Sequence, residues 1–176
     1  MGTTTGGLPY PDDDMPIADM AQAVQTLAEA LDPVGFAATM TSSQNIPNAT
    51  WTDLSNWTEA EDTRAALAAG VFTAPVRGIY LFAVNIFWGA NITSARYTSL
   101  WISKAGGAYQ EVPGNSTTAS SALDSPRQNA TAVLEMAVGD KIVPRCFQSS
   151  GASVSIAYAA SNYMSWGGSL LLRTAS

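Results

Sequence analysis

Carboxylates are the only side chains in this sequence suited to acid–base chemistry, because the chain contains no histidine. The absence of histidine excludes serine–histidine and cysteine–histidine catalytic groups and histidine metal ligands. The carboxylates cluster in two runs, residues 12–14 and residues 59–62. The first run precedes a proline and fits a helix cap, and the second fits a solvent-exposed loop. We therefore predict no catalytic residue and no enzymatic activity.

Three further groups of residues could bind a ligand or react. Trp51 and Trp57 are the kind of aromatic platforms that a sugar-cleaving site needs around its carboxylates, if the two share a cleft. The oxygen-rich stretch 124–129 could supply one or two calcium ligands, but it holds no closed ligand set, so no cofactor is predicted. The single cysteine, Cys146, rules out an intramolecular disulfide and lies in an apolar run. We interpret it as a buried structural residue rather than a reactive thiol.

The composition narrows the class of protein. The 176 residues are about one domain, with 47% hydrophobic and only 12% charged residues. This balance argues against disorder and suits a β protein whose surface is partly buried in an assembly. A net charge of -6 with only eight Lys and Arg residues argues against a nucleic-acid partner. No run is long enough to span a bilayer and no leader-like segment opens the chain, so we expect cytoplasmic synthesis without membrane insertion.

The first 33 residues are predicted to form an arm and one helix. A helix should begin near Pro16 and stop at Asp32 and Pro33. Its apolar positions recur at intervals of three and four, as in a heptad seam: Ile17, Met20, Val24, Leu27 and Leu31. Two heptads are too short to form a coiled coil alone, so the helix either packs on its own domain or bundles with copies of itself. The residues predicted to anchor the chain are Leu8, Tyr10, Ile17, Val24 and Leu27.

Residues 70–88 form the longest apolar run and predict a strand that is apolar on both faces. One face carries Tyr80, Phe82, Val84, Ile86 and Trp88, and the other carries Ile79, Leu81, Ala83, Asn85 and Phe87. A strand of a two-sheet sandwich needs one apolar face for the core. We expect another copy of the chain to cover the second face, where Asn85 is the one polar position.

Short β segments separated by turns fill the rest of the chain. Strands are predicted at residues 36–41, 96–103, 130–137, 141–148, 154–158 and 167–173. The composition of residues 59–70 favours a helix, and residues 114–128 are predicted to be a surface loop. Strands without alternating helices indicate an all-β sandwich.

Three motifs in this part of the chain resemble those of the globular head domain of complement subcomponent q and its tumour-necrosis-factor-like relatives. Phe72, Pro75, Gly78, Tyr80 and Phe82 match the family's first motif, G-x-F-x-x-P-x-x-G-x-Y-x-F. Gly139 and Asp140 match its L-x-x-G-D hairpin, and Trp166, Gly168 and Leu171 match its final F-x-G-x-x-L strand, with Trp in place of Phe. The resemblance spans roughly residues 34–174. It implies a ten-strand jelly roll that assembles as a tight trimer, with the aromatic strand near the threefold axis.

The N-terminal sequence is similar to the opening of virion proteins from tailed bacteriophages. The similarity lies in the sequence GLPYP, the acidic run after it, and a helix that ends LAEALDP. It implies a virion protein, assembled in the bacterial cytoplasm, whose N-terminal arm binds other virion proteins. The collagen-like stalk and secretion signal of the animal family are not expected in such a protein.

Together these observations predict an all-β jelly-roll sandwich of about 8–10 antiparallel strands with a short N-terminal α-helix. Residues 1–33 form the arm and anchoring helix, and residues 34–176 form a homotrimeric head whose interface is predicted to include Tyr80, Phe82, Val84 and Tyr158. The predicted function is that of a minor tail or fibre protein, which contacts a host cell-surface glycan or protein through loops 90–94 and 115–129. One alternative is a capsid decoration protein clamped by its N-terminal arm. Another is a cell-wall glycan depolymerase.

Overall fold

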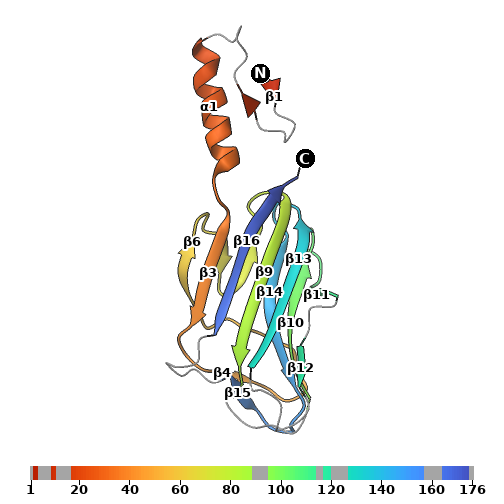
Figure 1. Cartoon of the computed structure of the whole chain (residues 1–176). Helices are drawn as coiled ribbons and strands as arrows, with labels where there is room; N and C mark the ends of the chain where they lie inside the picture. Colours follow the sequence, from red (N-terminus) through yellow and green to blue (C-terminus); the bar gives the residue numbers. More distant parts are fainter. Residues whose placement is uncertain are drawn as a thin grey trace. The chain divides into compact units, whose positions relative to one another are not determined.

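The structure is a computed structural model that describes residues 2–3, 9–10, 17–88, 95–113, 117–119, 127–156 and 164–174. These residues divide into two compact units between Pro33 and Val34 (Figure 1). The first unit contains β1 (Gly2–Thr3), which pairs antiparallel with β2 (Pro9–Tyr10), and the helix α1 (Ile17–Leu31). No helix in the described part of the chain is long and apolar enough to cross a membrane.

The helix α1 has the extent that the heptad pattern predicts, and it ends where Asp32 and Pro33 interrupt it. Within the first unit it lies beside β2. Ala23 is fully buried, Leu27 is half-buried and Val24 is 58% exposed. The helix therefore buries one side, and part of its predicted apolar seam stays in contact with solvent.

The second unit is a sandwich of antiparallel sheets, which confirms the predicted all-β jelly-roll class. One sheet has the strand order β13 (Arg127–Met136), β9 (Gly78–Phe87), β16 (Ser165–Arg173), β3 (Gly35–Met40) and β6 (Trp57–Asp62). The other has the order β11 (Gln110–Glu111), β10 (Arg96–Ser103), β14 (Lys141–Gln148), β8 (Val71–Thr73) and β7 (Leu67–Ala68). In this second sheet β12 (Thr117–Ala119) also pairs with β10, and β5 (Thr52–Asp53) also pairs with β14. A separate pair joins β4 (Gln44–Ile46) to β15 (Val154–Ile156).

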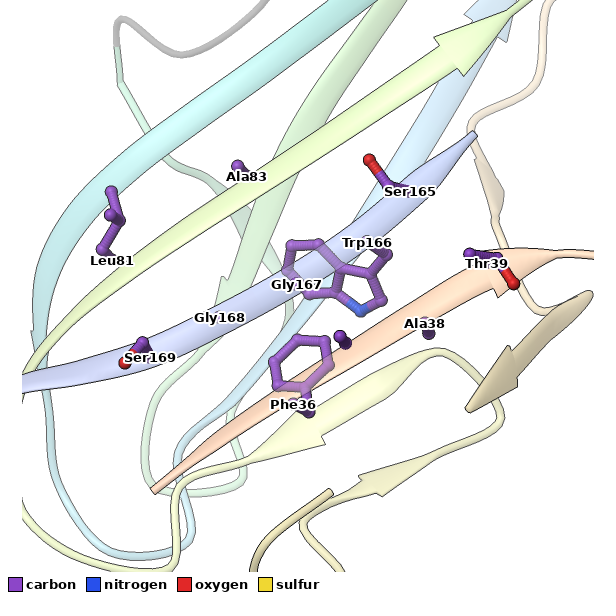
Figure 2. A pocket seen from close by; sticks show the side chains of 11 residues that line it. Phe36, Ala38, Thr39, Leu81, Ala83, Ser165, Trp166, Gly167, Gly168 and Ser169 are labelled. Carbon is purple, nitrogen blue, oxygen red and sulfur yellow. The ribbon is translucent and has the colours of Figure 1, made fainter. Parts of the chain in front are cut away.

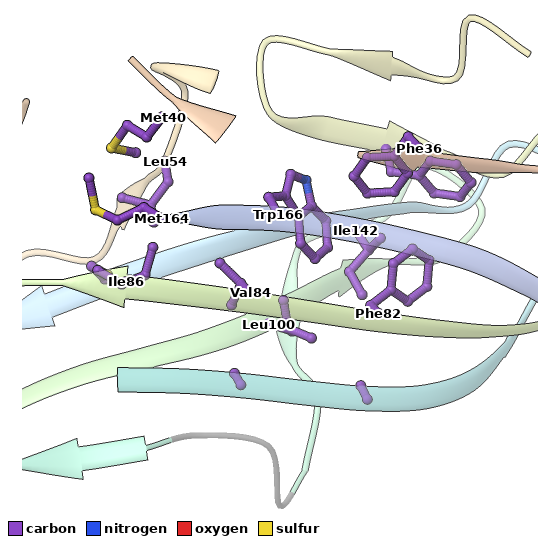
Figure 3. Close-up of a cluster of buried hydrophobic side chains, with 14 of the residues drawn as sticks. Phe36, Met40, Leu54, Phe82, Val84, Ile86, Leu100, Ile142, Met164 and Trp166 are labelled. Carbon is purple, nitrogen blue, oxygen red and sulfur yellow. The ribbon is translucent and has the colours of Figure 1, made fainter. Parts of the chain in front are cut away.

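Side chains from both sheets meet in one hydrophobic core (Figure 3). Its centre is aromatic: the ring centroids of Phe36 and Phe72 are 5.0 Å apart, and those of Phe82 and Trp166 are 5.7 Å apart. Gly168 of β16 makes this packing fit, because a Cβ there would lie 2.5 Å from the ring of Phe82. The aromatic and glycine positions of the sequence motifs therefore serve the core of the sandwich.

The segment 59–70 is not the helix that its composition favours. It continues β6 to Asp62, turns, and returns as β7. The Asp62 carboxylate accepts hydrogen bonds from the backbone N–H groups of Arg64 and Leu67, which stabilises the turn. Ala65 and Ala69 both have positive φ, which a right-handed helix does not allow. Pairing of β6 with β3 therefore outweighs the modest helix propensity of the segment.

The segment 114–128, predicted to be a loop, also contains strand residues. Thr117–Ala119 forms β12 against β10, and β13 begins at Arg127 rather than at Ala130. The added residues of β13 continue its ladder with β9, where Arg127 lies opposite Phe87. Backbone pairing with a long neighbouring strand extends β13 beyond the residues whose side chains alternate in the sequence.

Candidate functional site

The two apolar faces of β9 lie in different environments. Its even-numbered side chains point into the sandwich and are at most 1% exposed: Tyr80, Phe82, Val84 and Ile86, followed by Trp88. Of its odd-numbered side chains, Leu81 and Ala83 are exposed, and Ile79, Asn85 and Phe87 are half-buried. One face therefore belongs to the core, and the other is available to a partner.

This burial corrects the assignment of Tyr80, Phe82 and Val84 to a trimer interface. Phe82 stacks on Trp166 within the same chain, and the Tyr80 hydroxyl donates a 2.7 Å hydrogen bond to the Val76 carbonyl. Strict alternation shows that two faces exist but does not show which one points inward. Packing against the aromatic rings of the other strands decides which face points inward. A second copy can therefore reach only the face of Leu81 and Ala83.

The outer face of the five-stranded sheet has an uncharged centre, formed by the strands β13, β9, β16 and β3. Its outward-facing residues form three rows: Val133, Leu81, Ser169 and Gly35; Thr131, Ala83, Gly167 and Ala37; and Asn129, Asn85, Ser165 and Thr39. Charged side chains lie around these rows, at the two ends of β13 (Arg127 and Glu135), at the end of β16 (Arg173) and on the edge strand β6 (Glu59 and Glu61). We call the three rows the small-residue face.

A shallow hollow of about 440 Å³ lies on the small-residue face (Figure 2). Leu81, Ala83, Ser165, Ser169 and Thr39 border it, and the backbone of Gly167 crosses it. No residue that lines the hollow is titratable. The hollow can therefore bind an uncharged surface, but it offers no group for acid–base chemistry.

Apolar exposure is concentrated on this sheet. Of the seven large hydrophobic side chains that are exposed in the described part of the chain, four belong to its adjacent strands β9, β13 and β16: Leu81, Val133, Leu171 and Leu172. Leu171 lies at a register shift between β16 and β9. A contiguous apolar surface of this kind is typical of an interaction site.

The other residues with a predicted role are placed as follows. Tyr158, Leu8 and loop 90–94 lie outside the described residues, as does most of loop 115–129. Tyr10 is in β2, Ile17 is the first residue of α1, and Val24 and Leu27 lie in its middle turns. No contact with another molecule tests these residues, so their anchoring role stays a prediction.

The candidate chemical groups are structural where the chain is described. Cys146 is buried, as predicted, and this burial raises its pKa to about 12, against a weaker opposing effect of the Thr98 hydrogen bond. Asp140 accepts hydrogen bonds from the backbone N–H groups of Ala105 and Ala137. Half of the stretch 124–129 lies outside the described residues. The described part of the chain contains no group of three or more Asp, Glu, Cys or His that could hold a metal.

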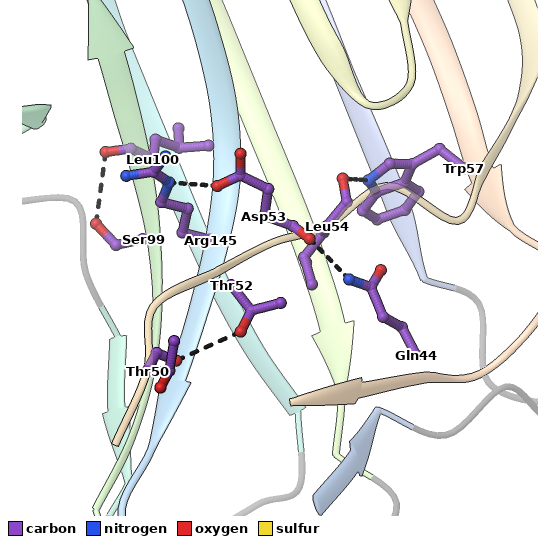
Figure 4. A network of polar contacts seen from close by, with 9 residues as sticks. All are labelled: Gln44, Thr50, Thr52, Asp53, Leu54, Trp57, Ser99, Leu100 and Arg145. Atoms are coloured by element: carbon purple, nitrogen blue, oxygen red, sulfur yellow. Dashed lines mark hydrogen bonds and ion pairs between the residues drawn. The ribbon is translucent and has the colours of Figure 1, made fainter. Parts of the chain in front are cut away.

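Trp51 and Trp57 do not share a cleft. The Trp57 indole donates to the Leu54 carbonyl at 2.9 Å, whereas Trp51 packs 5.1 Å from Trp101 on the other sheet (Figure 4 shows the first contact). Trp51 belongs to an aromatic surface that the sequence analysis did not identify. Alternation of Tyr97, Ser99, Trp101 and Ser103 along β10 was the signal that could have revealed it.

Comparisons with known proteins agree with the fold. No family model matches the chain, and no curated protein matches it at a significant level. The globular domain of zebrafish complement 1qA protein is 16% identical, aligns over 80% of this chain and 99% of its own, and gives a TM-score of 0.54. Eiger TNF from S. frugiperda is 13% identical, aligns over 82% of this chain and 96% of its own, and gives a TM-score of 0.58. Murine APRIL at pH 5.0 is 14% identical, aligns over 79% of this chain and 99% of its own, and gives a TM-score of 0.56. The chain therefore has the jelly-roll fold of complement and TNF-like domains, as its three motifs predicted.

Proposed function

We propose that this chain is a non-enzymatic β-sandwich module that assembles as a homotrimer through the small-residue face. The observation that carries the proposal is the exposed, uncharged face of four adjacent strands, with Leu81 and Val133 at its apolar end. The outward face of an antiparallel sheet is ordinarily polar when it meets water. Burial against other copies removes its apolar area from water, which favours association.

The composition of the face suits close packing of one sheet on another chain. Ala83, Gly167 and Ala37 form its middle row, so a partner can approach the backbone without displacing long side chains. No buried charge would need a partner there, because Arg127 and Glu135 lie at the ends of β13. A copy number of three is supported by the motif resemblance, and a cyclic arrangement closes without leaving an unpaired surface.

The setting that we propose is the surface of a phage particle, with the module acting in a minor tail or fibre protein. Support comes from the N-terminal similarity to tailed-phage virion proteins. Three copies around one axis would make weak contacts with a host surface additive through effective concentration. The role is therefore multivalent display, with the sandwich as scaffold and no chemical step.

Sedimentation equilibrium of the full chain tests the assembly. We expect a species of three times the 18.4 kDa chain mass at micromolar concentration. A monomer under these conditions would overturn the proposal. Labelled antibody on purified particles tests the setting: label at the tail is expected, label over the capsid would indicate decoration, and absence of label would remove the virion role.

A further inference from the structure

A second surface lies on the opposite side of the sandwich, on the outer face of the sheet that contains β10 and β14. It carries five aromatic residues, which we call the aromatic face: Trp51, Tyr97, Trp101, Tyr109 and Phe147. All five are half-buried, so each keeps part of its surface in contact with solvent. The outward positions of the small-residue face and its margins contain one aromatic residue, Phe87. The two outer faces of the sandwich are therefore suited to different partners.

The strand register brings the rings together. Tyr97 and Phe147 are directly opposite each other on β10 and β14, with ring centroids 5.8 Å apart. Trp51, just before β5, lies 5.4 Å from Phe147, 6.2 Å from Tyr97 and 5.1 Å from Trp101. The result is a continuous cluster of tilted rings, with three supplied by β10 and β14 and the fourth, Trp51, by the segment before β5.

Charged groups are held at the border of this platform. The Arg145 guanidinium lies 4.8 Å from the ring centroids of both Trp101 and Tyr109, and its Nε donates to the Asp53 carboxylate (Figure 4). Ser99 Oγ donates to Glu111 Oε1 at 2.7 Å. Asp53 and Glu111 are exposed, so both carboxylates can accept further hydrogen bonds from a ligand.

Folding of the sandwich does not require a second hydrophobic cluster on its outer face. Its rings lie on the solvent side of the sheet, where polar residues would be sufficient for folding. The Trp101 Nε1 is buried and has no hydrogen-bond acceptor within the described part of the chain, which costs free energy. An apolar surface of rings with fixed polar groups at its border is the composition of a ligand site.

We propose that the aromatic face binds an uncharged oligosaccharide. The C–H faces of pyranose rings would stack on the exposed parts of Trp51, Trp101 and Tyr97, while Asp53, Glu111 and Arg145 would exchange hydrogen bonds with ring hydroxyls. Two carboxylates and one guanidinium disfavour a polyanionic glycan. A quaternary ammonium ligand is also disfavoured, because Arg145 already occupies the space between Trp101 and Tyr109.

The oligosaccharide would be the ligand of the proposed display module. Only the avidity of its binding rests on that proposed function. Each chain carries a complete aromatic face, since all of its residues come from one copy. A single copy should therefore bind the oligosaccharide with the same intrinsic affinity as the assembly. Three copies should bind an immobilised glycan more tightly.

The full chain is applied to a printed array of neutral cello-, chito-, malto- and galacto-oligosaccharides, and the best-bound one is titrated in solution by calorimetry. We expect at least one series to bind, and Trp101→Ala or Trp51→Ala to weaken the solution affinity by about tenfold. Trp57→Phe is the control, because Trp57 is also half-buried but lies outside the aromatic face. The Trp57→Phe variant should bind the oligosaccharide with the affinity of the unmodified chain.

Two further variants keep the test decisive. If a tryptophan variant fails to fold by circular dichroism, Asp53→Asn and Glu111→Gln replace it, because both change exposed carboxylates without changing volume. If Ala83→Arg separates the copies, this variant should bind the oligosaccharide in solution with unchanged affinity. It should bind the glycan on the array more weakly than the unmodified chain does. Absence of binding to every oligosaccharide, or full affinity in the aromatic-face variants that fold, would overturn the proposal whatever the oligomeric state.

Discussion

Leu81 of β9 lies directly opposite Val133 of β13, and both side chains project outward, with exposed fractions of 37% and 60%. Cross-strand apolar pairs ordinarily stabilise a sheet from its buried side. Here the pair faces solvent, with a row of small residues on one side and the pair of Glu135 and Ile79 on the other. This relationship is the reason to expect another copy of the chain on this face.

Ala83→Arg should separate the copies. The substitution places a long charged side chain in the middle row of the small-residue face, next to Gly167, where burial without a partner is costly. Sedimentation equilibrium should then show the mass of one chain, with unchanged circular dichroism because Ala83 is exposed. Val138→Arg is the control, since Val138 is exposed in a turn outside the sheet and should leave the assembly intact. An Ala83→Arg protein that stays trimeric would place the interface elsewhere.

Gly168→Ala should lower the free energy of unfolding by about 1–3 kcal/mol, as overpacking of a filled core does. The new Cβ would lie 2.5 Å from the Phe82 ring and 2.8 Å from the Phe36 ring. Urea unfolding measures the loss. Combining Gly168→Ala with Phe82→Leu should cost less than the sum of the two single changes, because the smaller side chain relieves the clash. Strict additivity would contradict this account of the glycine.

Asp140→Ala should destabilise the chain by about 1–3 kcal/mol, because it leaves the N–H groups of Ala105 and Ala137 without their acceptor. Asp140→Asn keeps one acceptor oxygen and should cost less. Glu135→Ala is the comparison: its ion pair with Arg77 is exposed on both sides, so its loss should cost about 1 kcal/mol or less. Equal losses for Asp140→Ala and Glu135→Ala in urea unfolding would argue against the bridging role of Asp140.

Cys146 should not react with a thiol reagent at pH 8 until the chain unfolds. Its pKa of about 12 lies above the ordinary value of 9.0, so its contribution to stability is complete below pH 9 and is lost as pH rises toward 12. At pH 10.5 the loss should be about 2 kcal/mol relative to pH 8. Cys146→Ala should remove that part of the pH dependence. Burial also raises the pKa of Tyr80, so a smaller loss in the same direction should remain.

The sequence by itself was sufficient to predict the helix, most of the strands and the jelly-roll fold class. Heptad spacing and Pro33 predict α1 because helix periodicity and a chain-breaking residue are local properties. The alternation of residues 79–88 predicts a strand with two apolar faces for the same reason. The three motifs predict the fold because aromatic and glycine positions must match around one core, as Phe82 and Gly168 do.

Only the tertiary structure decided which face of β9 points inward, because that depends on rings supplied by β3, β8 and β16. Pairing with β3 likewise placed residues 59–62, the start of the segment 59–70 whose composition favours a helix, in the strand β6. The aromatic face combines residues from β10, β14 and the segments before β5 and β11, so the local alternation along β10 indicates only two of its five rings, Tyr97 and Trp101. Long-range backbone pairing brings these segments together, and neither periodicity nor composition encodes which segments pair.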